Sequence, residues 1–566
     1  MHRAVFVALL LAAAPAWPQS QPQPEAPSGW QSRDPAHAKH FMVAAANPLA
    51  VQAGVEVLRA GGGALDAAIA VQMVLGLVEP QSSGLGGGAF LLHWSQGDKK
   101  LTSYDGRETA PAAVRPDWLP GADGRPPGFV EAVVSGRSVG VPGVLRMLET
   151  AHRRHGRLAW ASLFEPAIGL AEQGFPMSPR LHRLLEGERE LRGNAAARAL
   201  YYDPEERPKA VGARIANPDY AATLRAVAAS GADAFYGGAI AEDIVAAVRG
   251  HARPGDLTLE DLARYRALER DPVCLPYRAM RVCSMGPPAG GAVVLQLLGI
   301  LERTDFRTAA PSSAAALHFL SEAGRLAYAD RGRYLADPDF VAVPLDGLLE
   351  PDYLDRRARL VGERSLGRAE PGRPRGAQPM AQAPETSPAG TSHVSIVDGR
   401  GEAVSMTTTI ESAFGSRILV RGFLLNNQLT DFSFAAGAAN RTEGGKRPRS
   451  AMSPVIAFGA GGELRAVLGS PGGASIINYV ARTLVAMIDW QLDAQAAVSL
   501  PHGGSMNGPT ELERDTAYEL LAPALRARGH EVRLGDFTSG LHVIERVPGG
   551  WRGGADPRRE GVAKGD

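Results

Sequence analysis

The spacing of apolar and polar positions divides the chain into a helix-rich first part and a strand-rich second part. Residues 49–60 have helical periodicity, and residues 64–78 are apolar almost all round, which is typical of a buried helix. From residue 144 to about residue 361 the pattern stays mostly helical. After residue 390 the period changes to two. Alternation over residues 391–398 and a second segment over residues 402–410 predict two strands joined as a hairpin.

Shorter patterned segments complete the set of predicted elements. An apolar strand at 466–468 is followed by the glycine-rich turn 469–475 and by a helix that begins at Ile476. A strand, a tight turn and a helix N-terminus in this order offer backbone N–H groups that can bind an oxyanion. The other predicted strands are 42–46, 89–94, 129–134, 455–458 and two short pieces within 265–285, and the other predicted helices are 164–173, 220–230, 293–302 and 314–328.

One boundary in composition lies just before the predicted hairpin. Residues 362–390 are rich in proline and glycine, a composition that cannot build a core and that exposes a chain to processing. A strand that starts abruptly at Thr391 suggests a cut between Gly390 and Thr391. Such a cut would give Thr391 a free α-amine beside its own hydroxyl, so that one residue would carry a nucleophile and a candidate base. On this segment alone, an ordinary edge strand remains an open alternative.

Composition and charge narrow the class of protein and of partner. The chain has 566 residues, 45% of them apolar and 21% charged, which fits one or more globular domains. Sixty basic residues balance sixty acidic ones, so no overall field would attract nucleic acid or an anionic membrane. We therefore expect a small-molecule partner.

The first residues predict export. A short positive region at residues 1–3, an apolar run over 4–14 and small residues at 14–16 are typical of a secretory signal peptide, assigned here to residues 1–19. The run is too short for a lasting membrane span. We expect a periplasmic or secreted protein, in which the polar, proline-rich residues 20–36 form an untethered arm.

Cysteines and histidines give no metal pattern. Cys274 and Cys283 could pair across a short hairpin in an oxidising compartment or remain two buried thiols, and the sequence leaves both possibilities open. Two histidine pairs, 37/40 and 152/155, have helical spacing but no third ligand nearby, so we expect them at the surface.

Two motifs suggest other enzymes but lack the required context. The glycine-rich segment 84–88 lies between a helix and a strand, whereas phosphate-binding loops run from a strand to a helix. Residues 136–140 match the Gly-x-Ser-x-Gly elbow of serine hydrolases. That elbow needs a helix directly after the serine, and helical patterning starts only near Val144. Neither motif is therefore interpreted as a site.

Several blocks together resemble the γ-glutamyltransferase family. In the second part they begin with Gly390-Thr391-Ser392-His393-Val394-Ser395-Ile396-Val397-Asp398. The other blocks lie at 46–50, 79–84, 107–111, 138–143, 425–432, 446–448, 469–473 and 555–561, in the family's order. The resemblance spans roughly residues 41–561, and the blocks are specific only in combination.

The resemblance implies a fold and a maturation route. It implies an N-terminal-nucleophile hydrolase of the α/β (α+β) class, a four-layer α/β/β/α sandwich that is made as one precursor and cuts itself before Thr391. The products would be a large subunit, 20–390 with its processing linker at about 362–390, and a small catalytic subunit, 391–566. The two would remain a heterodimer that needs no cofactor and no metal.

The resemblance also implies a site and an activity. Thr391 would be the nucleophile and Thr409 would position it. The implied catalytic residues are Thr391, Thr409, Gly472 and Gly473, and the implied substrate-binding residues are Arg107, Glu411, Gln428, Asp431 and Ser450. Arg107 and Ser450 match residues that bind the substrate α-carboxylate, Gln428 and Asp431 match residues near its α-amino group, and the glycines match the oxyanion-hole amides. The expected reaction transfers a γ-glutamyl group from glutathione or another γ-glutamyl amide to water, an amino acid or a peptide.

Departures from the family keep alternatives open. Ala451 replaces a serine of many members, Glu411 stands where some members have asparagine, and the short stretch 433–445 predicts that a lid loop is missing. An acylase that removes glutaryl-like groups from β-lactam amides is the alternative enzyme. An unprocessed periplasmic binding protein is the alternative outside enzymes.

Overall fold

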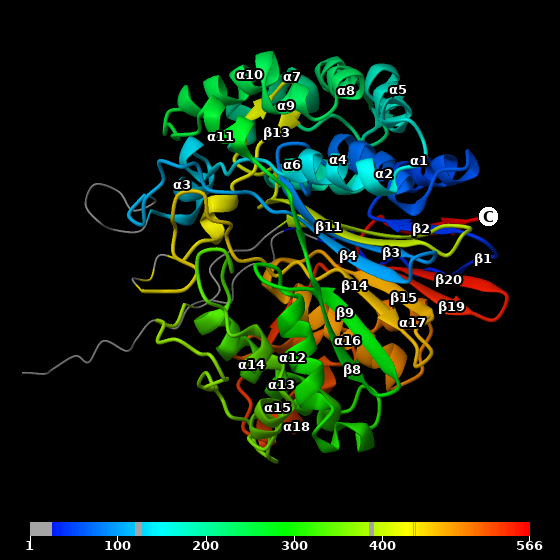
Figure 1. Cartoon of the computed structure of the whole chain (residues 1–566), viewed down its shortest axis with the longest axis vertical. Coiled ribbons are helices and arrows are strands. Elements are labelled where there is room, and N and C mark those ends of the chain that lie inside the picture. The colour runs from blue at the N-terminus through cyan, green and yellow to red at the C-terminus, as the bar shows by residue number, and fades with distance from the viewer. Residues whose placement is uncertain (1–24, 26, 119–126, 384–389, 434, 436) are drawn as a thin grey trace, which may run out of the picture.

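The chain folds into two stacked sheets with helices on both outer faces (Figure 1). The computed structural model describes residue 25 and residues 27–118, 127–383, 390–433, 435 and 437–566. The order of layers is helix, sheet, sheet, helix, which confirms the predicted four-layer arrangement. The proposed signal peptide, 1–19, lies outside the described residues.

Each central sheet combines strands from both sides of the Gly390–Thr391 bond. The first sheet has the order β21 (Val562–Gly565), β2 (Met42–Ala45), β10 (Gly390–Val397), β11 (Ala403–Glu411), β3 (Gly88–Ser95), β4 (Lys100–Gly106) and β7 (Leu268–Arg270). The second has the order β1 (Ala36–Ala38), β20 (Gly550–Ala555), β19 (His542–Val547), β15 (Leu464–Gly469), β14 (Val455–Phe458), β9 (Met280–Met285) and β8 (Pro272–Tyr277). Because β10 pairs with β2 and β11 pairs with β3, the two parts share one hydrogen-bonded sheet.

Strand β10 lies at the centre of the molecule, and its alternation separates two environments. Val394 and Ile396 pack into the core beneath the first helical layer. His393 and Ser395 face the second sheet, where the Ser395 hydroxyl donates to the His542 carbonyl at 3.1 Å. Every residue of β10 is buried, so the strand is central and not at an edge.

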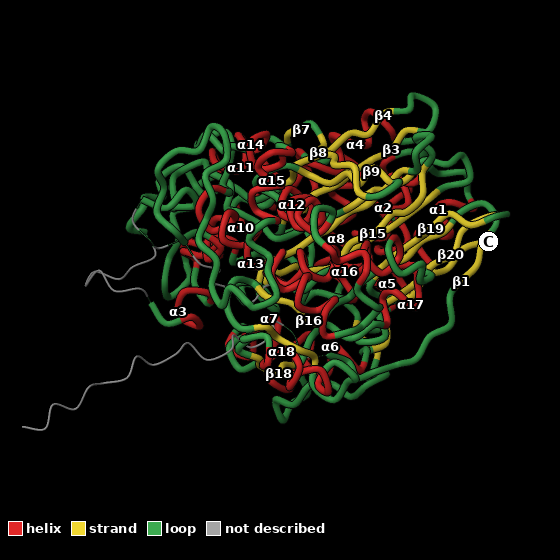
Figure 2. The backbone as a smooth tube through the Cα atoms, turned by 90° about the horizontal axis from the view of Figure 1, so that it is seen from below, coloured by secondary structure: helices red, strands yellow, loops and turns green. Residues whose placement is uncertain are grey.

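The first helical layer covers the first sheet with α1 (Pro48–Arg59), α2 (Ala64–Val78) and α4 (Val144–His155), and α5 (Glu165–Gln173) and α8 (Pro218–Ser230) pack outside them. Helix α2 is buried along its whole length, as its apolar pattern predicts. The opposite layer contains α12 (Gly291–Leu301), α13 (Ala314–Tyr334) and α16 (Ile476–Ile488), all labelled in the view from below (Figure 2). Helices α12 and α16 contact the second sheet, and α13 packs on α12. Among the described residues, no helix is long and apolar enough to cross a membrane.

The segment 129–134 corrects one prediction. It forms the short helix α3 (Phe129–Val133) and not a strand. Phe129 and Val130 are 46% and 56% exposed, so the segment has no sheet to pack on, and a brief apolar run does not distinguish a strand from a helical turn.

The arm at residues 20–36 corrects a second prediction. Residues 20–24 and 26 lie outside the described residues, but the described remainder is bound to the body of the protein. The backbone N–H of Ser28 donates to the Arg558 carbonyl, and that of Gln31 donates to the Pro557 carbonyl, both at 2.9 Å. The arm is therefore tethered by residues more than 500 positions away, which local composition cannot reveal.

The structure also tests the predictions made for the cysteines and the histidine pairs. Cys274 and Cys283 face each other across the β8–β9 hairpin and form a disulfide, which selects one of the two open possibilities. His37 and His40 are exposed as expected. The prediction for the other pair is wrong, because His155 is half-buried and stacks on His93 with ring centroids 3.9 Å apart.

Candidate active site

The bond between Gly390 and Thr391 lies at the start of β10, beside the end of β11. Thr391 is 1% exposed. The Thr409 hydroxyl donates to the Gly390 carbonyl oxygen at 2.6 Å, and it accepts the Glu411 N–H at 2.8 Å. Since the Glu411 N–H can only donate, the Thr409 proton is directed at the Gly390 carbonyl. The predicted proximity of Thr409 and Thr391 is confirmed.

Arg559 fixes the other side of this segment. Its side chain is 1% exposed, and its Nη1 donates to the Thr391 carbonyl at 3.1 Å. Arg559 also donates to the Thr538 carbonyl from Nε and Nη2, at 3.2 and 2.9 Å. The sequence block 555–561 contained Arg559, but nothing local assigned it a role because its partner lies 168 residues away.

The glycine turn after β15 approaches Thr391 from the second sheet. Gly472 and Gly473 have φ values of +127° and +59°, which disfavour side chains. A Cβ on Gly472 would lie 2.5 Å from Tyr479 Cε2, so the turn needs glycine for space as well. The predicted order is confirmed, since β15 leads through this turn and a single 3₁₀ turn (Gly473–Ser475) into α16.

A charged cluster lies on the opposite wall. Arg107 is 1% exposed, and its Nη2 lies 2.5 Å from Asp431 Oδ2. Gln428 Nε2 donates to the same Asp431 oxygen at 2.6 Å. Arg107 also donates to the carbonyls of Pro448 and Arg449 at 3.1 and 3.2 Å. Two backbone carbonyls and one carboxylate therefore set the orientation of the guanidinium group.

Glu411 lies behind this cluster. It is fully buried at the end of β11, and its Oε2 accepts a hydrogen bond from Asn427 Nδ2. Burial, and then the nearby Asp431 carboxylate, raise the pKa of Glu411 well above its ordinary value. Among the described residues that line the cavity, Glu411 is absent. The structure therefore brings Glu411 beside the predicted site but not onto its wall.

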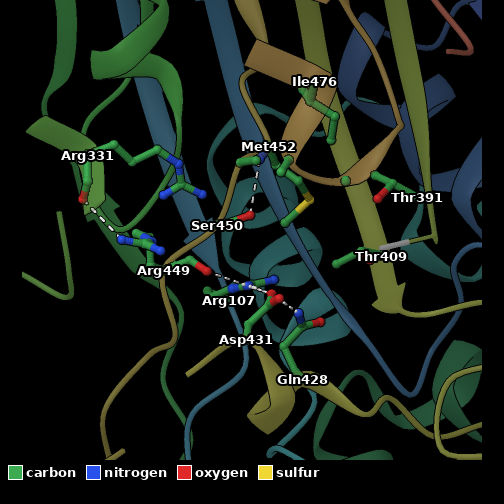
Figure 3. Close-up of a pocket in the computed structure, with 13 residues that line it drawn as sticks. Arg107, Arg331, Thr391, Thr409, Gln428, Asp431, Arg449, Ser450, Met452 and Ile476 are labelled. Carbon is green, nitrogen blue, oxygen red and sulfur yellow. Dashed lines mark hydrogen bonds and ion pairs between the residues drawn. The ribbon is translucent and has the colours of Figure 1, made fainter. Parts of the chain in front are cut away.

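The two threonines, Gly473 and the charged cluster surround one narrow cavity (Figure 3). Ser450 is oriented by its own N–H, which donates to the Pro288 carbonyl at 2.8 Å, and its hydroxyl accepts the Met452 N–H at 3.1 Å. The cavity is lined by Arg107, Arg331, Thr391, Thr409, Gln428, Asp431, Arg449, Ser450, Ala451, Met452, Gly473, Ala474 and Ile476. Segments up to 369 residues apart thus converge on one space, with the two threonines on one side and the charged cluster on the other.

Sequence reasoning missed several supporting residues. Asn427 binds Glu411 and accepts the Ser412 N–H at 3.0 Å, and Arg449 Nη1 donates to the Arg331 carbonyl at 3.0 Å. Asn427 lies inside a matched block, and Arg449 lies directly after one. Their closeness in sequence to Gln428 and Ser450 was the only signal that could have pointed to a role in the site. Arg331 had none, because it belongs to the interior of α13.

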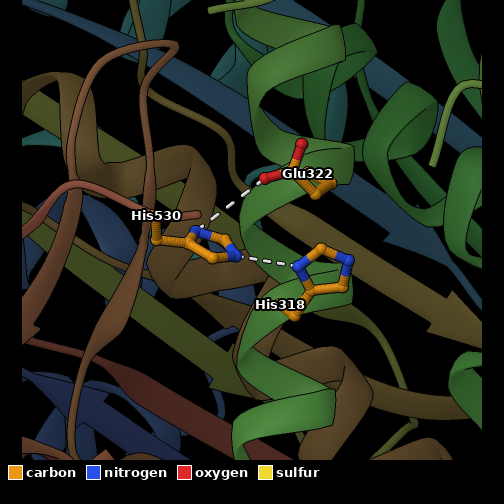
Figure 4. Close-up of side chains that lie close together, drawn as sticks. All are labelled: His318, Glu322 and His530. Atoms are coloured by element: carbon orange, nitrogen blue, oxygen red, sulfur yellow. Dashed lines mark hydrogen bonds and ion pairs between the residues drawn. The ribbon is translucent and has the colours of Figure 1, made fainter. Parts of the chain in front are cut away.

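A separate buried cluster, formed by two residues of α13 and by His530, has the composition of a metal site (Figure 4). One ligand atom from each of His318, Glu322 and His530 lies within 4.8 Å of the others. However, Glu322 Oε1 already accepts the Arg325 Nε–H at 2.9 Å. A paired carboxylate beside a guanidinium group is a poor ligand for a cation.

Hydrogen bonds account for both imidazole rings of that cluster. His318 Nε2 lies 2.7 Å from the Gly362 carbonyl, which can only accept, so this nitrogen carries a proton. His318 Nδ1 then accepts from His530 Nε2 at 2.7 Å, and His530 Nδ1 accepts from the Thr510 hydroxyl at 2.7 Å. The two neutral rings are satisfied, so the cluster joins α13 to the segment around His530 and gives no reason to assign a metal.

Comparison with known proteins places the chain in a family. A family model described as Gamma-glutamyltranspeptidase matches residues 50–566. The chain belongs to this family. It is 35% identical over 547 residues to the glutathione hydrolase proenzyme of Bacillus subtilis, and the aligned region covers 93% of this chain and 92% of that protein. The glutathione hydrolase proenzyme of Escherichia coli is also 35% identical, over 541 residues, with 93% of this chain and 91% of that protein covered.

A solved structure extends the similarity to the whole fold. A cephalosporin acylase from Bacillus halodurans superposes with a TM-score of 0.84 and 28% sequence identity, covering 98% of this chain and 99% of that one. The family match and this superposition confirm the family and the fold expected from the sequence.

Proposed function

We propose that this protein is a γ-glutamyltransferase/glutathione hydrolase that cuts itself between Gly390 and Thr391 and then uses Thr391 as its nucleophile. One observation carries the proposal. The Thr409 hydroxyl, which donates to the Gly390 carbonyl, lines the same cavity as the Arg107–Asp431 pair. This pair is complementary to an amino-acid zwitterion.

The geometry at the start of β10 supports self-cleavage. The Thr391 Oγ attacks the Gly390 carbonyl carbon, the hydroxyl proton passes to the Thr391 nitrogen, and the C–N bond breaks, which leaves Gly390 as an ester on Thr391 Oγ. Water then hydrolyses the ester to a Gly390 carboxylate and a free Thr391. The Thr409 hydroxyl, 2.6 Å from the carbonyl oxygen, would stabilise the charge that develops there. One such donor is typically worth about 10²–10³ in rate.

Cleavage defines the mature protein. We assign residues 20–390 to a large subunit and residues 391–566 to a small subunit, after removal of a signal peptide at 1–19 and export to the periplasm or beyond. The pairing of β10 with β2 and of β11 with β3 supports a lasting heterodimer. Both curated relatives are named proenzymes, which also supports processing.

Substrate recognition would exchange one internal ion pair for two. In the structure Arg107 and Asp431 bind each other at 2.5 Å. The α-carboxylate of a γ-glutamyl group would bind Arg107 and Ser450, and its ammonium would bind Asp431 and Gln428. Two fixed charges of opposite sign determine the direction of the side chain, so the scissile amide points toward Thr391.

Catalysis would then use the new N-terminus. The α-amine of Thr391 has an ordinary pKa of about 8, so part of it is neutral at physiological pH and can accept the hydroxyl proton. The Thr391 oxygen attacks the γ-carbonyl, and Gly472 and Gly473 amides would stabilise the oxyanion. The amine leaves with a proton, and a γ-glutamyl ester remains on Thr391. Water or an acceptor amine releases it.

A glutaryl acylase is the second candidate, supported by the similarity to the Bacillus halodurans cephalosporin acylase. A glutaryl group keeps the carboxylate of a γ-glutamyl group but lacks its ammonium. Asp431, with Gln428 bound to it, provides an anionic partner that a glutaryl group would leave unused. The charged cluster therefore favours γ-glutamyl substrates.

Trapping the intermediate tests the proposal. Purified protein is mixed with a γ-glutamyl anilide, quenched in acid within one turnover and digested for mass spectrometry. The expected result is a γ-glutamyl mass increase on the peptide that begins with Thr391. Turnover without any increase on that peptide, or an increase on a different residue, would contradict the proposed nucleophile.

A further inference from the structure

The N-terminal arm, which we define as residue 25 and residues 27–33, lies on the loop that carries Arg559. The backbone N–H groups of Ser28 and Gln31 bind the carbonyls of Arg558 and Pro557 at 2.9 Å each. The arm thus belongs to the large subunit but docks on the small one.

Side chains hold the arm from two directions. The Arg558 guanidinium lies over the Trp30 ring, 4.9 Å from its centroid. Arg183, in the large subunit, donates from Nη1 to the Pro27 carbonyl at 3.0 Å. These contacts bring the start of the arm to the interior.

There the Glu25 carboxylate occupies what we call the arginine pocket, formed by Arg180, Arg559 and Ser82. The Ser82 hydroxyl donates to Glu25 Oε1 at 2.8 Å. Glu25 Oε2 lies 3.1 Å from Arg559 Nη1 and also binds Arg180 Nη2. Glu25 is 1% exposed, so a carboxylate near the chain's start is buried among two guanidinium groups and a hydroxyl.

Charge balance favours a carboxylate at the position of Glu25. Arg180 and Arg559 are each 1% exposed, and a buried unpaired charge is strongly unfavourable. Glu79 lies 3.7 Å from Arg180, but burial raises its pKa to about 8, so it is mostly neutral at physiological pH. Glu25 pairs with both arginines and therefore contributes to neutralising the arginine pocket, together with Glu560 beside Arg180 and Asp556 near Arg559.

The same carboxylate lies against the bond that is cut. A Cβ on Gly390 would lie 2.5 Å from Glu25 Oε1. Arg559, which binds Glu25, also donates to the Thr391 carbonyl at 3.1 Å. One arginine thus connects the occupant of the pocket to the residue after the scissile bond.

We propose that the arginine pocket is a carboxylate-binding site, filled by this chain's own Glu25, and that its occupancy positions Arg559 on Thr391 during self-cleavage. Glu25 is a positioning residue in this scheme. The binding part stands apart from the proposed function, whereas the positioning part rests on self-cleavage at Thr391.

Chemical rescue in an uncleavable background tests the binding part. Glu25→Ala combined with Thr391→Ala should have a lower thermal midpoint than Thr391→Ala alone, and formate or acetate should raise it in a saturable manner. Acetamide, which lacks the charge, should have no effect at equal concentration. Glu186→Ala is the matched control, since the Glu186 side chain is 59% exposed. An unchanged midpoint, or equal effects of acetate and acetamide, would overturn the site.

The Glu25→Gln variant shows whether rescue by formate requires an empty arginine pocket or follows from any destabilisation of the protein. Its neutral amide should lower the midpoint but block rescue, because the amide still fills the space that formate needs. If Glu25→Ala does not fold, the site is tested with Glu25→Gln in formate gradients. A lowered midpoint that formate leaves unchanged supports the site, and a wild-type midpoint overturns it.

Cleavage kinetics test the positioning part. With Thr391 intact, Glu25→Ala should cut itself about tenfold more slowly, the effect of losing roughly one well-placed hydrogen bond, and formate should restore the rate. A wild-type rate in Glu25→Ala would overturn the positioning role. If the wild-type chain itself is not cut, the proposed function fails, and the rescue in the uncleavable background still decides the pocket.

Discussion

Replacing Asp431 with asparagine isolates the ammonium-binding part of the proposed site. The Asp431 carboxylate accepts from Arg107 at 2.5 Å and from Gln428 at 2.6 Å, and its side chain is 18% exposed. Asparagine keeps the shape and removes the charge. Arg107 retains its two backbone carbonyls, and Glu108, whose carboxyl lies 3.6 Å away and whose pKa burial raises to about 8, can ionise beside it.

The expected magnitude comes from one charge-assisted hydrogen bond. Such a bond contributes about 1.5–3 kcal/mol, and about 1.4 kcal/mol corresponds to a factor of ten. We therefore expect kcat/KM for a γ-glutamyl anilide to fall by roughly 10- to 150-fold in Asp431→Asn. A glutaryl anilide has the same carboxylate but no ammonium, so any disturbance of Arg107 affects both substrates, and their ratio reports the ammonium contact alone.

The assay compares the two anilides on purified wild-type protein, on Asp431→Asn and on Asp117→Asn. The last variant is the control, since the Asp117 side chain is 78% exposed. The preference for γ-glutamyl over glutaryl substrate should collapse in Asp431→Asn and persist in Asp117→Asn. An equal loss on both substrates would refute the assignment of Asp431 to the ammonium group.

Three further predictions concern processing, the disulfide and pH. Thr409→Ala removes the donor on the Gly390 carbonyl, so self-cleavage followed on gels should slow by about 10²–10³-fold. Thr409→Ser keeps the hydroxyl and should cleave at a rate near that of the wild type. Equal cleavage rates in the wild type and both variants would contradict the role of the hydroxyl. Replacing Cys274 and Cys283 with serine opens a short loop, so the free energy of unfolding in urea should fall by about 2–3 kcal/mol, and an unchanged value would show that the disulfide adds no stability. Because burial raises the pKa of Glu108 to about 8, this carboxyl favours the folded state below its ordinary pKa, and that stability is lost as pH rises through about 8. Glu108→Gln should therefore gain stability relative to wild type between pH 4.5 and 8 in urea titrations, and a pH-independent difference would refute this sign.

Local pattern predicted the elements that depend on local sequence. The apolar run of α2 predicted a buried helix, and the structure has one there. The alternation of β10 predicted a strand, and this strand lies between a helical layer and the second sheet. Phe129–Val133 failed because five residues do not distinguish a strand from a helical turn when packing is weak.

The candidate site was predictable where its residues lie in recognisable blocks. Thr391, Thr409, Gln428, Asp431 and Ser450 line one cavity, as the resemblance implied. What the sequence could not supply were contacts made across the fold.

Those contacts involve single side chains with distant partners. Arg559 reaches the Thr391 carbonyl, and Glu25 enters a pocket built by Arg180 and Arg559. Arg559 lies in a matched block that gave no indication of its partner, and the composition around residue 25 indicated only an untethered arm.

The most direct test of the central claim is N-terminal sequencing of the purified protein beside its Thr391→Ala variant. The wild-type protein should give two N-termini, one near residue 20 and one at Thr391, and the variant should give only the first and remain inactive. A variant that is cut normally before position 391, or a wild-type protein that is active as one uncut chain, would contradict the account.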